Sequence, residues 1–174
     1  MKIKTVGLCP TPRKLFEKSL TKTLMKTALC AVFGMGYRMI TYTDSLENIR
    51  ADMLEGGFFV DWPNPPSPSV HLRVLAGSYL VWLAVDTSAN KVVGFINAIS
   101  DGVLSAYIPL LEVLPEYQNM GIGGELVKRT LHSLKNLYMI DVLCDEHLQK
   151  YYGKFGMQSA TGVLARNYDR QSGE

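Results

Sequence analysis

The feature that most limits the fold is a glycine cluster placed between a buried strand and a helix. Residues 111–124 read LEVLPEYQNMGIGG, an apolar strand followed by a loop and a helix start. A helix start has unpaired N–H groups and the positive end of the helix dipole, and together these bind phosphate groups. Glycines let an anion approach the backbone because they have no Cβ. The segment predicts a phosphate-binding loop; the alternative is that these glycines only end one element and start another.

The spacing of the glycines narrows the kind of phosphate ligand. A P-loop requires Gly-Lys-Ser/Thr, which the sequence lacks. A dinucleotide fingerprint requires a third glycine at position 126, where this chain has Leu126. Both residue patterns therefore disfavour a nucleotide-binding α/β protein.

Apolar runs and helical periodicity alternate through the second half of the chain, which predicts an α/β fold with a mixed sheet. The proline-rich segment 58–69 is predicted to be a loop, because proline gives no N–H to a helix interior or a sheet ladder. A helix is expected from Asp44 or Ser45, where a side chain can cap it, to Gly56-Gly57. The other predicted helices are 70–75, 120–137 and 145–155, and the predicted strands are 39–42, 79–85, 91–100, 105–114, 139–144 and 162–168.

The composition fits one globular domain. The chain has 174 residues, of which 47% are hydrophobic, and no apolar run is long enough to cross a membrane. The three cysteines (Cys9, Cys30 and Cys144) are an odd number without C-x-x-C spacing, which is typical of a reducing compartment and favours the cytoplasm. The three histidines form no zinc-binding pattern, so no metal site is expected.

Charge divides the chain near residue 38. Residues 1–38 contain eight basic residues and one acid, for a charge of +7, whereas residues 39–174 carry −5. Because the expected domain, 39–174, is acidic, we expect neither a nucleic acid nor a membrane as its partner. The basic extension 1–38 has three interpretations: a tail or an upstream start before Met39, a secretory signal, and an organelle transit peptide.

Two motifs resemble those of the GNAT superfamily, the acyl-CoA-dependent N-acetyltransferases. The pattern Gln118-x-x-Gly121-x-Gly123, after Val-x-Pro-Glu-Tyr, resembles the loop that binds the acyl-CoA pyrophosphate in that family. About thirty residues later, LQKYYGKFGM at 148–157 is similar to the aromatic segment of its penultimate helix. The resemblance covers roughly residues 39–170. It implies a mixed, mostly antiparallel sheet of six to seven strands flanked by about four helices.

The resemblance also implies acetyl-CoA as co-substrate. Backbone amides at the loop would anchor the pyrophosphate, and a free N–H at Val113 or Leu114 would polarise the thioester carbonyl. The implied cofactor-binding residues are Val113, Leu114, Gln118, Asn119, Met120, Gly121, Ile122, Gly123 and Gly124. Two positions depart from the family pattern: Asp145 replaces a frequent asparagine, which puts one polar cofactor contact in doubt, and Met157 replaces the usual phenylalanine.

Two side chains are candidates for proton transfer. Glu112 is an acid within an apolar strand and can take the proton of the amine; the alternative is a solvent-facing or ion-paired side chain. Tyr152 matches the position that serves as general acid in many family members, and the alternative is a packing role. Its ordinary pKa of about 10 lies above the thiol value of about 8.5, so the phenol is a competent proton donor. Glu116 is expected to be a solvated loop residue, and Cys144 a small buried side chain rather than a nucleophile.

The acceptor site is the least defined part of the sequence. By resemblance, the first two helices and their loop form its wall, which here means Phe58, Phe59, Trp62 and the proline-rich turn. These aromatic residues can stack on a flat acceptor or close the core beneath the loop, and Asp61 can attract a cationic amine. We expect direct acetyl transfer to a primary amine on a small molecule or peptide, with a homodimer as an option. The alternative is an inactive CoA-binding module of the same fold.

Overall fold

The structure is a computed structural model, and it describes residues 38–173. The chain divides into two units, residues 1–37 and 38–174. The predictions made for the basic extension 1–38 lie outside the described residues, apart from Arg38.

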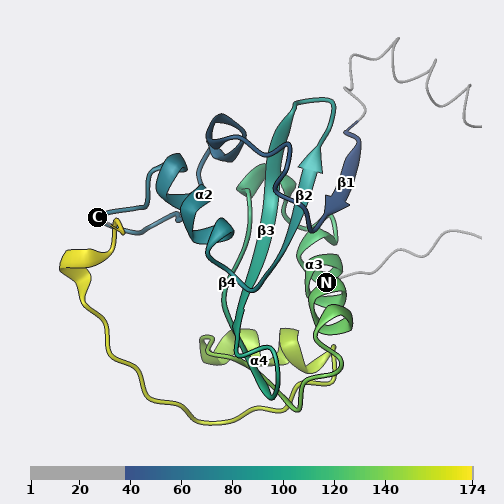
Figure 1. Cartoon of the computed structure of the whole chain (residues 1–174), viewed down its shortest axis with the longest axis vertical. Helices are drawn as coiled ribbons and strands as arrows, with labels where there is room; N and C mark the ends of the chain where they lie inside the picture. Colours follow the sequence, from purple (N-terminus) through teal and green to yellow (C-terminus); the bar gives the residue numbers. More distant parts are fainter. Residues whose placement is uncertain (1–37, 174) are drawn as a thin grey trace, which may run out of the picture. The chain divides into compact units, whose positions relative to one another are not determined.

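The five strands of the described part form one mixed sheet in sequence order (Figure 1). The first four pair antiparallel, and the last pairs parallel to its neighbour. The strands are β1 (Ile40–Thr43), β2 (Leu80–Asp86), β3 (Lys91–Ser100), β4 (Ser105–Val113) and β5 (Met139–Val142). The α-helices are α2 (Pro68–Ala76), α3 (Ile122–Ser133) and α4 (Glu146–Gly153). The predicted fold class, with its mixed and mostly antiparallel sheet, is confirmed.

Neighbouring residues of β3 show that helices cover both faces of the sheet. A Cβ on Gly94 would lie 3.2 Å from Ile122 of α3. The ring of the next residue, Phe95, lies 4.3 Å from that of His71 in α2. Successive side chains of a strand point to opposite faces, so α3 and α2 lie on opposite sides of the sheet. Both faces of the central strand are therefore core, and residues 92–98 of β3 are buried throughout.

The last two strands part halfway along β4. Their pairing ends at Ile108 and Val142, and the next residue of β4 is Pro109, which has no N–H to donate. Beyond this point β4 continues to Val113 beside β3 alone. The final residues of β4 therefore have one side open, and this side leads into the glycine-rich loop.

The helix predicted from Asp44 or Ser45 is wrong. Only a short 3-10 helix, η1 (Ala51–Leu54), forms in this segment. The Ser45 N–H donates to the Thr43 hydroxyl at 3.0 Å, and the Glu47 N–H donates to the Ser45 hydroxyl at 3.2 Å. Such short side-chain bonds compete with a helical backbone. Met53 and Leu54 are nevertheless buried in the core.

The strand predicted at 162–168 is also wrong. Residues 158–167 have no regular structure, and Val163 is 100% exposed. Among residues 38–173 the sheet therefore has five strands rather than six or seven, and it is flanked by three α-helices rather than four. A strand needs the ladder of a neighbour, and the edge strand β5 offers one of only four residues.

Candidate functional site

The glycine-rich loop has the backbone geometry of an anion-binding helix start. It begins with a 3-10 turn, η2 (Pro115–Tyr117), and continues through Asn119 and Gly121, whose φ angles are 61° and 82°. Gly121 is the N-cap of α3, and the Glu125 N–H donates to its carbonyl at 3.1 Å. The N–H groups of Ile122, Gly123 and Gly124 therefore precede the first intrahelical bond and are available to a phosphate.

Hydrogen bonds from neighbouring elements fasten this loop. The Tyr117 hydroxyl donates to the Asp86 carboxylate at 2.9 Å, and the Gln118 side-chain amide donates to the Val113 carbonyl at 3.1 Å. Burial raises the pKa of Asp86, but hydrogen bonds from Ser88 and Tyr117 outweigh it and hold this pKa below its ordinary value. The Arg38 guanidinium lies 4.3 Å from the centre of the Tyr117 ring. The loop is therefore held in place by the protein itself.

The register of β4 separates the two backbone donors that the sequence left as alternatives. Val113 pairs with Gly94 across the β3–β4 ladder, and the Leu114 N–H donates to the Val93 carbonyl at 2.9 Å. Val113 is therefore in a non-hydrogen-bonded pair, whose N–H and carbonyl point away from β3. They point to the side that β5 has left. The Val113 N–H remains a candidate donor, whereas the Leu114 N–H is already bonded.

The side chains of Glu112 and Val113 point to opposite faces of the sheet. The Glu112 side chain holds the loop around Phe59, which is distant in the sequence. Its carboxylate accepts the Phe59 N–H at 2.7 Å. Burial raises the pKa of Glu112, and the Phe59 N–H opposes this rise. The side chain is thus neither solvent-facing nor ion-paired with a lysine or arginine in the described residues. Glu116, in contrast, is on the surface and pairs with Lys91 at 3.6 Å.

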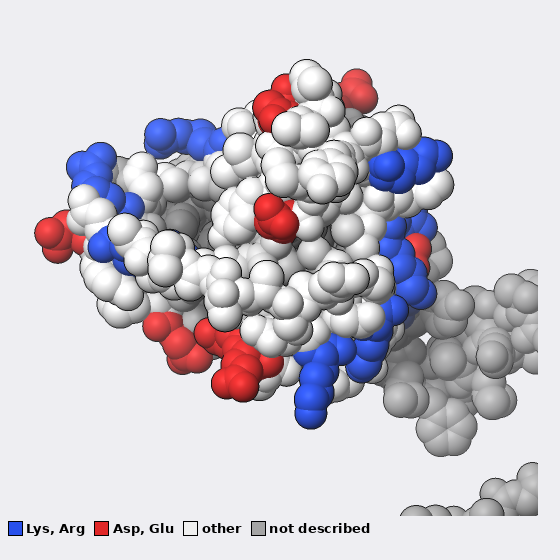
Figure 2. Space-filling view, turned by 90° about the horizontal axis from the view of Figure 1, so that it is seen from below, with Lys and Arg blue, Asp and Glu red and all other residues white. Residues whose placement is uncertain are grey.

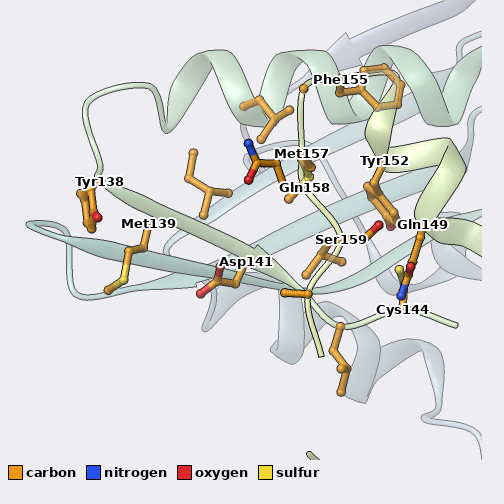
Figure 3. A pocket seen from close by; sticks show the side chains of 16 residues that line it. Tyr138, Met139, Asp141, Cys144, Gln149, Tyr152, Phe155, Met157, Gln158 and Ser159 are labelled. Carbon is orange, nitrogen blue, oxygen red and sulfur yellow. The ribbon is translucent and has the colours of Figure 1, made fainter. Parts of the chain in front are cut away.

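Tyr152 lines a groove of about 860 Å³ along β5. Tyr152, Gln149 and Cys144 lie at one end of this groove, and Tyr138 and Met139 lie at the other (Figure 3). Tyr152 is only 7% exposed. Burial, together with Cys144 and Tyr151, raises the pKa of Tyr152 to about 12, so its phenol is neutral over the whole ordinary pH range.

The Tyr151 hydroxyl reaches the start of α3. A Cβ placed on Gly123 would lie 3.0 Å from the Tyr151 hydroxyl and 3.7 Å from Val113. Consecutive helical residues point about 100° apart, so the side chains of Tyr151 and Tyr152 point in different directions from α4. Tyr151 also packs edge-on against Phe155, at 5.4 Å between ring centres. Two consecutive tyrosines on a helix must point in different directions, but the sequence does not show which of the two rings faces the glycine-rich loop.

A second cavity, of about 220 Å³, lies on the α2 side between residues 54–59, the prolines and His71. Phe58 and Phe59, two of the residues expected at the acceptor wall, line it, whereas Trp62 does not. Trp62 packs against Phe59 at 5.2 Å between ring centres, and the backbone of Asp61 is left-handed at φ 67°. His71 was missed, because a single histidine in a nine-residue helix gives no signal of its surroundings.

Several further features of residues 38–173 bear on the class of site. No group of three or more His, Cys, Asp or Glu side chains could hold a metal ion there, and none of the helices in this range is long and apolar enough to cross a membrane. Viewed from the side of α4, uncharged side chains cover most of the middle of the surface, and Lys and Arg side chains lie on both sides of this view (Figure 2).

Comparison with known proteins identifies related chains. Residues 43–157 match the model of the acetyltransferase (GNAT) family. A crystal structure of a putative acetyltransferase from Deinococcus radiodurans is 41% identical, covers 76% of this chain and 92% of its own, and superposes with a TM-score of 0.73. A GNAT-family acetyltransferase from Streptococcus pneumoniae is 26% identical and covers 74% of this chain and 98% of its own, with a TM-score of 0.54.

A curated relative from Pyropia yezoensis is described as an uncharacterised N-acetyltransferase. It is 26% identical over 100 residues, which is 56% of this chain. The chain spans 58% of the length of that relative. The predicted resemblance to the superfamily is thereby confirmed.

Proposed function

We propose an N-acetyltransferase activity for this chain, which belongs to the acetyltransferase (GNAT) family. In the proposed reaction an acetyl group moves from acetyl-CoA directly to a primary amine while both are bound. The observation that carries the proposal is the set of free N–H groups at the start of α3, next to the open side of β4. Phosphates can bind at the N–H groups of α3, and the thioester carbonyl can enter beside the open side of β4.

The cofactor side of the site is assigned to the loop and the end of β4. The pyrophosphate would lie against backbone amides, and the Val113 N–H would polarise the thioester carbonyl as charge develops on its oxygen. The Leu114 N–H already donates to the Val93 carbonyl, so it would not donate to the cofactor. Leu114 would only position the backbone next to Val113. The residues proposed for cofactor binding are Val113, Leu114, Gln118, Asn119, Met120, Gly121, Ile122, Gly123 and Gly124.

Glu112 is proposed as the general base. An amine attacks only when neutral, yet its ordinary pKa is roughly 8 to 10. The half-buried carboxylate of Glu112 lies on the face opposite Val113, where it can take the proton of an amine that enters from that side. The new N–C bond forms at the acetyl carbon, and the C–S bond breaks.

Tyr152 is proposed as the general acid for the departing thiolate. Its phenol is neutral at physiological pH, so it has a proton to give when charge develops on sulfur. The CoA thiol leaves after it has received this proton. Burial raises the pKa of Tyr152 to about 12 and so makes its phenol a weaker acid, and this observation favours the second candidate function, a CoA-binding module without catalysis.

Parallel titrations of the full chain with acetyl-CoA and with ATP test the cofactor assignment. At a hundredfold excess over Kd, a true ligand stabilises by about 2.7 kcal/mol and raises the melting temperature by several degrees. We expect this shift with acetyl-CoA alone. Release of CoA thiol in the presence of amines then separates the enzyme from the inactive module. A folded chain without a shift would overturn the proposal.

A further inference from the structure

A half-buried thiol and a buried phenol lie at one end of the groove along β5. Cys144 is the one cysteine in the described residues, and it lines this groove. It is half-buried, so it is less buried than the sequence predicted. Tyr152 lines the same groove and is 7% exposed. In Figure 3 the Tyr152 hydroxyl points toward the end of the groove where Cys144 and Gln149 lie.

The Tyr152 hydroxyl has no hydrogen-bond partner among the described residues. Polar groups on side chains this buried are nearly always bonded in native proteins, so an unbonded one at a groove indicates a ligand that completes it. Burial raises the pKa of Tyr152 to about 12, and Cys144 adds to this rise, so the two groups are close enough to interact electrostatically. A ligand atom bonded to the Tyr152 hydroxyl therefore also lies near the Cys144 thiol.

The path of the chain places Cys144 beside the opening between β4 and β5. The pairing of these strands ends at Ile108 and Val142, and Cys144 follows Val142 by two residues. In the proposed function, Tyr152 gives its proton to the sulfur of CoA at this opening. The sulfur of a bound CoA therefore lies within reach of Tyr152 and next to the sulfur of Cys144.

Two neighbouring sulfur atoms define a reaction that the acetyl transfer does not use. A thiolate can attack a disulfide sulfur, and the exchange leaves a mixed disulfide. With CoA disulfide as the co-reactant, the Cys144 thiolate attacks one sulfur and the S–S bond of the reagent breaks. One CoA stays joined to Cys144, and the other leaves as a thiolate that takes up the proton lost by Cys144. No further oxidant or reductant is consumed.

We propose that Cys144 is a modification site that takes up CoA as a mixed disulfide from CoA disulfide. The bound CoA occupies the place of acetyl-CoA in front of Tyr152, so acetyl transfer stops until a thiol reductant removes it. This inference rests on the proposed acetyltransferase function and concerns the regulation of the same site. The N–H groups at the start of α3 recognise the pyrophosphate of the reagent as they do that of the substrate.

The rates of two disulfides with the full wild-type chain test this proposal. CoA disulfide has the pyrophosphate, whereas glutathione disulfide lacks it. Peptide mapping by mass spectrometry separates the reaction at Cys144 from any at Cys9 or Cys30. We expect CoA disulfide to modify Cys144 at least about tenfold faster, because binding holds the reacting atoms together. Excess acetyl-CoA should slow this reaction, and dithiothreitol should reverse it. Equal rates for the two disulfides at Cys144 would overturn the proposal.

A matched variant moves the thiol within the same groove. Met139 is 38% exposed at the other end, so Met139→Cys in a Cys144→Ser chain offers a thiol away from Tyr152. We expect this thiol to show no preference for CoA disulfide. Gly121→Val, which strains the loop, should slow the CoA disulfide reaction at Cys144 about tenfold and leave the glutathione reaction unchanged. The same preference at position 139 would contradict the assignment, and the wild-type ratio decides even when a variant does not fold.

The outcomes separate this proposal from the proposed function. If amines are acetylated from acetyl-CoA while Cys144 reacts equally with both disulfides, the modification site is overturned and the acetyltransferase function stands. If Cys144 prefers CoA disulfide but no amine is acetylated, the modification site stands and the chain is the inactive CoA-binding module. If acetyl-CoA does not bind and Cys144 shows no preference, both proposals fail.

Discussion

The two irregular loops of the proposed site, residues 115–121 and 55–66, differ in how they are held. The first turns at Asn119 and Gly121, and hydrogen bonds of Tyr117 and Gln118 fasten it. The second turns at Gly56, Gly57, Phe59 and Asp61, and of these the bulky phenylalanine is the type that rarely adopts left-handed backbone. Glu112 and the surrounding rings hold it in that shape.

Because different residues hold the two loops, the same fold can keep its cofactor while its acceptor changes. The glycine-rich loop is held by hydrogen bonds from Tyr117 to Asp86 and from Gln118 to Val113, which form without a ligand. The acceptor loop depends on one carboxylate and on packing from other elements. Substitutions around the second loop can therefore reshape it without disturbing the first.

Replacement of Tyr152 by phenylalanine is expected to have the largest effect and tests the cofactor side. Loss of a general acid typically costs about 100-fold or more in rate. We expect kcat to fall by that factor, with the KM for acetyl-CoA unchanged, in steady-state assays of thiol release. Tyr138→Phe is the control, because Tyr138 is exposed at the other end of the groove. A kcat within twofold of the wild type would remove the general-acid role.

Glu112→Gln makes the corresponding test on the acceptor side. The glutamine carbonyl can still accept the Phe59 N–H, so the loop is expected to keep its shape while kcat falls about 100-fold. Because burial raises the pKa of Glu112, the wild-type rate falls on acidification at a higher pH than for an ordinary glutamate. The variant loses this acidic limb of the pH profile.

The same raised pKa predicts a stability difference. A carboxyl with a raised pKa in the folded chain stabilises it fully below the ordinary pKa, and this contribution is lost as the pH rises through the folded value. At pH 7 the Glu112→Gln chain is therefore expected to melt no lower than the wild type. Glu116→Gln, at a surface position, should change neither rate nor melting. A cooperative loss of structure in Glu112→Gln would contradict both expectations.

Valine at Gly121 and at Gly57 sharpens the comparison between the loops. Both glycines have positive φ, 82° and 102°, where an L-residue costs roughly 1–2 kcal/mol. Gly121→Val is expected to weaken acetyl-CoA binding about tenfold by calorimetry. Gly57→Val is expected to raise the acceptor KM and leave acetyl-CoA binding unchanged. If both variants affected the same ligand, the two loops would not be separate sites.

Asp86→Asn tests the fastening of the glycine-rich loop. The variant keeps an oxygen for Tyr117 but loses the charge, so we expect a loss of about 1 kcal/mol in the free energy of unfolding at pH 7. Since the pKa of Asp86 is lowered in the folded chain, this advantage of the wild type is lost as the pH falls through that lowered pKa. Urea unfolding at several pH values measures it, with the exposed Asp52→Asn as control. An unchanged difference at acidic pH would contradict the charge-based account.

The smallest expected effect belongs to Tyr151→Phe. The phenylalanine keeps the packing against Phe155 and removes the hydroxyl beside Gly123. Loss of one hydrogen bond to the cofactor should raise the KM for acetyl-CoA about threefold, with kcat unchanged. If kcat instead fell as far as in Tyr152→Phe, the two tyrosines would have exchanged roles.

Local signals made most of the fold predictable. The turn residues on both sides of β3 defined its limits, Lys91–Ser100, as the sequence predicted. The helix expected from Asp44 or Ser45 failed because Thr43 and Ser45 bond nearby N–H groups instead. The strand at 162–168 failed because apolar residues alone do not supply a ladder partner.

The site was predictable where its chemistry is local. The spacing of Gln118, Gly121 and Gly123 indicated the helix start directly. The choice of Val113 over Leu114 needed the β3–β4 register, and the clamp on Phe59 joins residues 53 positions apart. The rings around His71 come from residues 58–59 and from Phe95, which are far apart in the sequence. Such contacts leave no periodic trace in a sequence.

The parting of β4 and β5 has a consequence for how the two substrates reach the site. The glycine-rich loop leads into α3, and the His71 cavity lies at α2 on the opposite face of the sheet. On the proposed assignments, each substrate has its own entrance, and neither blocks the path of the other. A ternary complex then requires no moving lid, since the topology of the sheet already brings the two partners together end to end.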